Sequence, residues 1–476
     1  MSSPTVIRNT FDVLQKFNGR GDRDGQGEDG AIARPAPAFT PSDFVIAAVL
    51  GGLAVALSIF GFHLIRHAYG LLEFQDIWFQ ADIARVIDNM TNAGGSHWRT
   101  SVHPVTSILL YPFGALLTGL GFSPLAAARL IVVSFCGLNP AVLFFVLRQI
   151  ALPRGIAALF AGLFIVSAST MFWSSVVELY PIACFSLLPA LFLLARRASS
   201  RGWWILASAM TLSITVTNWM VGLIAAALRW NFTRFLSITA AALAIVLSLS
   251  IAQSLLFKDA RIFLNPHGLA WDAVNFSGPN LQRRGYLEKP WSPLANLKVL
   301  YIDSAVTPPI RVEKEGLEYV ETNQASSFPA GSYWGPAALA AWVLLLVLGI
   351  AGAIQNRALR PFFLGLGLML MGNGILHSLY GQVTFLYSMH VIPLLTILAA
   401  ASWFGRGRWL GVGLAAVVMT AGGWNNWLQL HQSADLAAKV ARKPCVSILQ
   451  AYYPGAPGPN HPWNSSLAAC VPPGFR

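Results

Sequence analysis

The sequence has few charged residues for its length. Only 11% of its 476 residues are Asp, Glu, Lys or Arg, whereas 55% are hydrophobic. Soluble globular proteins carry about 25% charged residues, so this chain lacks the charge needed to cover a water-exposed surface. Apolar runs long enough to cross a hydrocarbon core about 30 Å thick recur along it. The composition therefore predicts an all-α polytopic membrane protein and excludes a soluble globular fold.

Acidic residues and cysteines are also scarce. The 20 Asp and Glu residues are outnumbered by 32 Lys and Arg residues, giving a net charge of +12. The arginines lie in short loops between apolar runs, a pattern that follows the positive-inside rule and argues against nucleic acid as a partner. Four cysteines are too few for a disulfide framework. Cys136 and Cys184 lie in apolar runs, and we predict a disulfide only between Cys445 and Cys470 in the polar C-terminal tail.

The arginine loops predict the topology. Five short loops contain arginine and no acidic residue: Arg148 and Arg154; Arg196, Arg197 and Arg201; Arg229 and Arg234; Arg357 and Arg360; Arg406 and Arg408. If all five are cytoplasmic, residues 203–228 must reverse as a hairpin, with a turn around Thr217, Asn218 and Trp219. The alternative is one long tilted helix, which would place the last two arginine pairs outside. We favour the hairpin, which gives about eleven transmembrane helices.

This topology divides the chain into five parts. Residues 1–43 are rich in Gly, Pro and charge and are predicted to form a disordered cytoplasmic N-terminus. Residues 44–257 form an N-terminal transmembrane module that includes an outer loop, 66–124. A large outer loop, 258–334, separates this module from the C-terminal transmembrane helices, 335–427. Residues 428–476 form an outer tail.

The first outer loop contains the densest set of ionisable residues. They are Asp76, Asp82, Arg85, Asp88, His97, Arg99 and His103. The spacing of the charges at 82, 85 and 88, with apolar residues between them, predicts a helix that lies on the membrane surface. The simpler alternative is a solvated interfacial helix whose charges have no further role.

The same loop resembles a known superfamily. Asp82-Ile83-Ala84-Arg85, then His103-Pro104 and an amphipathic run ending in Tyr111-Pro112, resemble the first loop of GT-C-fold glycosyltransferases. The resemblance is to the branch that contains protein O-mannosyltransferases and the aminoarabinose transferases of lipid A, and it covers roughly residues 44–405. This sequence departs from the pattern where His390 stands in place of the Arg-Tyr that relatives often have.

The resemblance implies a GT-C-like fold with juxtamembrane helices in the first outer loop, in a bacterial inner membrane with the active site facing the periplasm. It implies inverting, single-displacement sugar transfer with Asp82 as the general base; Asp76 is the second candidate. The donor would be a polyprenyl-phosphate-linked sugar, since nucleotide sugars are not available outside the cytoplasm, and the acceptor a lipid, glycan or protein. We expect no cofactor. We also expect no metal, because this loop has no Asp-x-Asp motif and arginine can bind a monophosphate leaving group.

Further candidates for substrate binding lie in several loops. An acidic residue at a span boundary is costly unless it is useful, and arginines and aromatic rings suit phosphates and sugars. The full set is Arg85, Arg99, His103, Arg129, Glu178, Arg283, Arg284, His377, Tyr387 and His390. The alternatives are a surface carboxylate for Glu178, an interfacial anchor for Arg129, ordinary surface charges for Arg283 and Arg284, and core residues for the histidines.

Two other functions fit a polytopic membrane protein. A transporter or lipid-linked glycan flippase would place charged residues or broken helices at the bilayer midplane. The ionisable residues of this chain instead crowd the outer surface, which favours chemistry at that surface. A non-catalytic scaffold is the second alternative, and it predicts that Asp82 is dispensable.

Overall fold

The computed structural model describes residues 38–67, 77–267, 270, 274, 277–279, 291–315, 317–322, 332–380 and 383–441. Several predictions lie outside these residues. They concern most of the N-terminal segment, Asp76, Arg283, Arg284 and the proposed Cys445–Cys470 disulfide.

The described chain is mainly helical, as the composition predicts. Within it, six helices are long and apolar enough to cross a membrane: Pro41–Leu64, Pro124–Gln149, Phe232–Leu256, Gly335–Gln355, Arg357–Leu379 and Thr384–Phe404. Shorter apolar helices accompany them at Thr106–Gly119, Arg154–Val166, Tyr180–Arg196 and Val216–Arg229. These helices identify a membrane protein by their length and composition.

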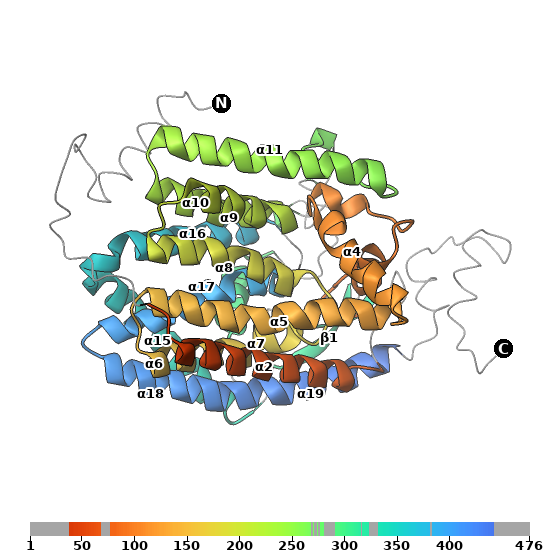
Figure 1. The fold of residues 1–476 in the computed structure, drawn as a ribbon. Helices are drawn as coiled ribbons and strands as arrows, with labels where there is room; N and C mark the ends of the chain where they lie inside the picture. The colour runs from red at the N-terminus through yellow and green to blue at the C-terminus, as the bar shows by residue number, and fades with distance from the viewer. Residues whose placement is uncertain are drawn as a thin grey trace.

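The long helices lie side by side in a bundle (Figure 1). In chain order the first half comprises α2 (Pro41–Leu64), α5 (Pro124–Gln149), α6 (Arg154–Val166), α7 (Ala168–Trp173), α8 (Tyr180–Arg196) and α11 (Phe232–Leu256). The second half comprises α15 (Gly335–Gln355), α16 (Arg360–Leu379), α17 (Ser388–Ala400), α18 (Arg408–Val417) and α19 (Gly423–Ala441). The first outer loop forms α3 (Ile83–Thr91), the short helix η1 (Trp98–Ser101) and α4 (Thr106–Gly119), which lie together at one end of the bundle (Figure 1).

Residues 201–229 reverse direction, as the arginine pattern predicts. They form α9 (Arg201–Ile214), the short helix η2 (Val216–Asn218) and α10 (Trp219–Arg229). The indole N–H of Trp219 donates to Ser208 at 3.1 Å, and at the open end of the hairpin Arg229 donates to the carbonyl of Ala198 at 3.0 Å. Gly222 is required between the two helices, because a Cβ there would lie 2.4 Å from Oγ1 of Thr211.

The tip of this hairpin is held by the first outer loop. Val216 N–H donates to the carbonyl of Val102, and Val105 N–H donates to that of Ser213, both at 3.1 Å. A break in a helix at membrane depth frees backbone groups that other protein atoms must satisfy. The hairpin and the first outer loop satisfy these groups for each other, which fixes their relative positions.

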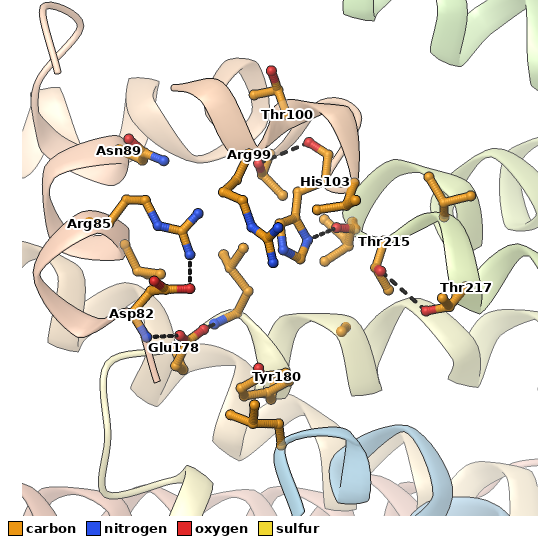
Figure 2. A pocket seen from close by; sticks show the side chains of 18 of the residues that line it. Asp82, Arg85, Asn89, Arg99, Thr100, His103, Glu178, Tyr180, Thr215 and Thr217 are labelled. Atoms are coloured by element: carbon orange, nitrogen blue, oxygen red, sulfur yellow. Dashed lines mark hydrogen bonds and ion pairs between the residues drawn. The ribbon is translucent and has the colours of Figure 1, made fainter. Parts of the chain in front are cut away.

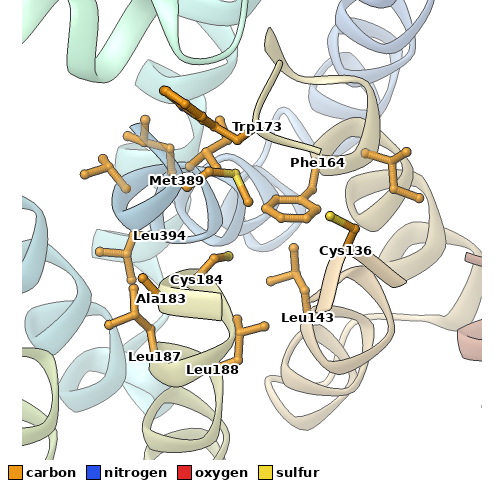
Figure 3. Close-up of a cluster of buried hydrophobic side chains, with 14 of the residues drawn as sticks. Cys136, Leu143, Phe164, Trp173, Ala183, Cys184, Leu187, Leu188, Met389 and Leu394 are labelled. Atoms are coloured by element: carbon orange, nitrogen blue, oxygen red, sulfur yellow. The ribbon is translucent and has the colours of Figure 1, made fainter. Parts of the chain in front are cut away.

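The core lies where α5, α6–α7, α8 and α17 meet (Figure 3). The span Thr384–Phe404 is the most enclosed, with 83% of its apolar window buried. Cys136 and Cys184, which lie in apolar runs of the sequence, are buried in this core as free thiols. Phe164, Trp173 and Met389 lie in the same cluster (Figure 3).

The N-terminal boundary of the first span differs slightly from the prediction. α2 begins at Pro41, because Thr40 and Asp43 form a capping box at its start. Asp43 is fully buried and forms ion pairs at 3.0 Å with both Arg148 and Arg154. Asp43 therefore belongs to the folded bundle, and it ties the start of α2 to the loop between α5 and α6.

The second outer segment adds a small amount of other structure. It contains α14 (Pro293–Lys298), a π-helical turn at η3 (Val299–Asp303), and antiparallel strands β1 (Ile310–Glu315) and β2 (Leu317–Thr322), with Ile310 paired to Thr322. These strands were not expected from the sequence. Side chains on α19 hold this segment: Asn426 donates to the carbonyl of Ala305 at 2.8 Å, and Ile310 N–H donates to Gln429 at 3.1 Å.

Candidate functional site

The segment before α3 is held in place by buried aromatic side chains. Trp78 and Phe79 have no exposed surface, and the ring of Phe79 packs against those of Phe172 and Phe385. Phe79 and Gln80 have φ values of 54° and 59°, and Ala81 N–H donates to the carbonyl of Trp78 at 2.8 Å. Two successive non-glycine residues with left-handed φ are uncommon and persist where surrounding packing enforces them. This tight turn ends directly before Asp82.

Asp82 is the residue immediately before α3 and is fixed on two sides. Its carboxylate forms an ion pair with Arg85, one turn along the helix. Its backbone N–H donates to Oε1 of Glu178 at 3.0 Å. The Asp82 side chain is nevertheless 42% exposed, whereas that of Arg85 is 14% exposed. The carboxylate is thus oriented by the protein and still accessible.

Asp82 lies at the wall of a cavity of about 450 Å³ (Figure 2). The cavity is formed by the first outer loop, the loop before α8, the tip of the α9–α10 hairpin, and the ends of α16 and α17 that meet it. Its polar lining residues include Asp82, Arg85, Asn89, Arg99, His103, Glu178, Tyr180, Thr215, Thr217, Tyr380, Tyr387 and His390. A cavity of this size with a few convergent polar groups is the usual form of a small-molecule site.

Two guanidinium groups give one wall of the cavity its positive charge. Arg85 and Arg99 both lie over the ring of Trp98, at 5.6 and 5.0 Å from its centroid. Figure 2 shows both side chains extending toward the space between Asp82 and His103. Paired arginines of this kind bind phosphate or carboxylate groups, and stacking on an aromatic ring limits their motion.

His103 is a neutral member of the same wall. Its Nδ1 lies 2.8 Å from the carbonyl oxygen of Ile214 at the hairpin tip, so this nitrogen carries the proton and donates. Burial, followed by the positive charge of Arg99, lowers the pKa of His103 to about 3. The imidazole is therefore uncharged near neutral pH, and its Nε2 is left as a hydrogen-bond acceptor.

Glu178 is buried behind Asp82, in the loop that precedes α8. Its two carboxyl oxygens accept the backbone N–H groups of Asp82 at 3.0 Å and Leu179 at 2.7 Å. Burial, followed by the negative charge of Asp82, raises the pKa of Glu178 to about 7. A strongly perturbed carboxyl group in a cavity is typical of functional sites.

One end of the cavity is aromatic. The ring of Tyr387 stacks on that of His377 at 4.1 Å, and Tyr180 lies 6.0 Å from His390 between ring centroids. Trp173 supports Tyr180 from behind at 4.6 Å. This end is built mainly from α8 and α17, whereas the charged wall comes from the first outer loop.

No family model matches the chain, and no curated protein matches it. The structure alone therefore locates the predicted site residues.

Seven of the predicted residues line the one cavity: Asp82, Arg85, Arg99, His103, Glu178, Tyr387 and His390. Two others do not. His377 is fully buried behind Tyr387, and Arg129 lies with its guanidinium over the ring of Phe62, 5.3 Å from the centroid. Asp76, Arg283 and Arg284 lie outside the described residues.

Several lining residues were not among the predicted site residues. Thr215 and Thr217 enter the cavity from the hairpin tip, and Tyr180 enters from the start of α8. Thr215 and Thr217 could have been found from the sequence, because polar residues interrupt the apolar run 203–228 there. Among the described residues, no group of three or more His, Cys, Asp or Glu side chains is arranged to hold a metal ion.

Proposed function

We propose that this protein is a membrane glycosyltransferase of the GT-C type with about eleven transmembrane helices. It transfers a sugar from a polyprenyl-phosphate donor to a lipid, glycan or protein acceptor. The reaction takes place on the extracytoplasmic face of a membrane, which for a bacterial protein is the inner membrane facing the periplasm. The observation that carries the proposal is the accessible carboxylate of Asp82 beside two guanidinium groups in one cavity.

Asp82 has the geometry expected of a general base. Sugar transfer to a hydroxyl requires a carboxylate that accepts the hydroxyl proton while the oxygen attacks the anomeric carbon. The electron pair of the breaking bond leaves with the phosphate oxygen, and configuration at the anomeric carbon inverts in this single displacement. The ion pair with Arg85 orients the carboxylate, and the tight turn at Phe79–Gln80 fixes the backbone that carries it.

Arg85 and Arg99 suit the leaving phosphate. A polyprenyl phosphate gains negative charge as the sugar departs, and guanidinium groups already in place stabilise that charge without reorganisation. Both arginines line the same cavity as Asp82 and stack on Trp98. Arginine alone can therefore serve a monophosphate leaving group in this site.

The position of the cavity along the helices supports the outward-facing site. α8 spans 17 residues, from Tyr180 in the cavity to Arg196, so its two ends are roughly 25 Å apart. The ion-pair cluster of Asp43, Arg148 and Arg154 likewise lies at the end of α5 that is farther from the cavity. If the arginine-rich end is cytoplasmic, the cavity lies toward the opposite surface.

A reconstitution experiment tests the proposal. The purified chain in lipid nanodiscs is incubated with radiolabelled polyprenyl-phosphate sugars and with envelope lipid and protein extracts from a strain that lacks the gene. Transfer of label to an acceptor by the wild type, and its loss in Asp82→Asn, is the expected result. If no lipid-linked sugar is consumed, the proposal fails; movement of the intact donor across a bilayer without transfer would favour a flippase.

A further inference from the structure

His390 is a buried polar side chain at the aromatic end of the cavity. It lies on α17, lines the cavity, and has only 3% of its surface exposed. Neither of its ring nitrogens has a hydrogen-bond partner among the described residues. Leaving a buried donor and acceptor unpaired is costly, so nearly all such groups in folded proteins have partners. A ligand in the cavity is the available source of those partners.

The rings around His390 form a surface suited to a sugar. The centroids of Tyr180 and Tyr387 lie 6.0 and 6.2 Å from that of His390. Trp173 packs behind Tyr180 and His377 stacks behind Tyr387, so neither ring can retreat from the cavity. Aromatic side chains held this way offer flat faces to the C–H groups of a sugar ring and edges to its hydroxyl groups.

We propose that this aromatic end of the cavity binds the donor's sugar and that this sugar is uncharged, an inference that rests on the proposed function. A neutral imidazole has one N–H donor and one nitrogen acceptor, and a sugar hydroxyl is likewise both donor and acceptor. An ammonium group only donates and a carboxylate only accepts, so a charged substituent placed against His390 would leave one of its nitrogens unpaired. Hydroxyl groups therefore match His390, and charged groups do not.

The charged residues of the cavity support the same choice. Neither carboxylate of the cavity lacks a partner for its charge, because Asp82 pairs with Arg85 and both oxygens of Glu178 accept backbone N–H groups. The guanidinium groups that would neutralise a uronic acid lie on the phosphate-binding wall. The residues that line the cavity around His390 are uncharged. They come from α8, from α16 and its C-cap, and from the segment that leads into α17: Tyr180, Ala183, Leu376, Tyr380, Val383, Leu386 and Tyr387.

Donor binding measured with short-chain probes tests the inference. The full-length chain in nanodiscs is titrated with farnesyl phosphate and with farnesyl phosphate linked to a neutral hexose, to an amino pentose, or to a uronic acid. We expect the hexose conjugate to bind roughly tenfold tighter than farnesyl phosphate, the gain from two hydrogen bonds of ordinary strength. The two charged conjugates should show no such gain.

Variants of His390 assign the gain to this side chain. His390→Phe should abolish the gain from the hexose and leave the affinity for farnesyl phosphate unchanged. His390→Gln, which keeps a donor and an acceptor, should retain part of it. His431→Phe makes the same substitution on α19, where the ring packs on Trp427 outside the cavity, and should behave as the wild type.

The outcomes separate the two proposals. Preference for the amino pentose or the uronic acid, or an undiminished hexose gain in a folded His390→Phe protein, would overturn the neutral-sugar inference and leave the glycosyltransferase proposal standing. Absence of binding by farnesyl phosphate and by all three conjugates would overturn both.

Discussion

The backbone N–H of Asp82 donates to Oε1 of Glu178 at 3.0 Å, although 96 positions separate the two residues. This bond joins the start of α3 to the start of α8, that is, the first outer loop to the helical core. It leaves the carboxylate of Asp82 unobstructed, because only the backbone takes part. Glu178 therefore acts as a positioning residue for the candidate base, and the cavity forms where the two segments meet.

The raised pKa of Glu178 predicts a pH-dependent stability. Burial raises this pKa from 4.5 to about 7, so between these values the folded protein holds a proton that the unfolded chain has lost. The folded state then loses stability as pH rises through this window, by on the order of 3 kcal/mol in full. Glu178→Gln has no proton to lose. Thermal unfolding of both proteins in detergent should show the wild-type Tm falling relative to the variant from pH 4.5 to 7, and parallel curves would contradict the prediction.

Asp82→Asn tests the candidate base. Asparagine keeps the size of the side chain and its ability to accept a hydrogen bond from Arg85, but it cannot take up the acceptor proton. Loss of a positioned general base costs about 10²–10⁴-fold in rate, so transfer should fall by at least the lower value with donor affinity little changed.

The matched control is Asp88→Asn, on the same helix. Asp88 accepts a hydrogen bond from Asn92 at 2.8 Å and does not line the cavity, so transfer by this variant should be close to wild type. Wild-type transfer by the Asp82 variant would refute its assignment as the base. Asp76→Asn should show an intermediate loss if Asp76 orients the acceptor, and a loss as large as that of Asp82→Asn would make Asp76 the base instead.

Much of the helical framework could be predicted from the sequence, because apolar runs and arginine-rich loops are local signals. The reversal between α9 and α10 followed from arginines at both ends of one apolar run. The loop Phe79–Gln80 could not be predicted, since its left-handed turn depends on packing against Phe172 and Phe385, far away in the sequence. The strands β1 and β2 were missed because their segment is polar and short.

The sequence named some of the residues that line the cavity, but it did not predict the geometry that brings them together. The ionisable residues of the first outer loop and an acidic residue at a span boundary gave Asp82, Arg85, Arg99 and Glu178 as candidates, and all four line one cavity. Nothing local to the sequence indicates that Arg129, at a similar boundary, lies elsewhere beside Phe62. Whether Arg129 reaches the cavity is decided by packing of the whole bundle.

Comparing substitutions of Arg99 and Arg129 distinguishes phosphate binding in the cavity from a general effect of positive charge. Arg99→Gln removes a guanidinium from the cavity wall. In the proposed reaction this charge contacts the donor phosphate in both the bound ground state and the transition state, so its loss should raise the KM for the lipid-linked donor and lower kcat. We expect kcat/KM to fall roughly 10–100-fold, since hydrogen bonds to charged groups contribute about 1.5–3 kcal/mol. Arg129→Gln, outside the cavity, should leave both constants near wild type. Equal losses in the two variants would show that Arg99 has no special role.

The orientation of the chain in the membrane gives the last prediction. Arg311 and Arg357 are both exposed and lie on either side of α15, a single apolar helix of 21 residues. About 20 such residues cross the hydrocarbon core once, so the two positions should lie on opposite sides. In a background with the four native cysteines replaced by alanine, Arg311→Cys should react with a membrane-impermeant maleimide in intact cells. Arg357→Cys should react only after the membrane is opened.

This assignment rests on the α9–α10 hairpin, because one crossing at 201–229 would reverse every later loop. Labelling of Arg357→Cys from outside would therefore move the cavity to the cytoplasmic side and remove the basis for a polyprenyl-phosphate donor.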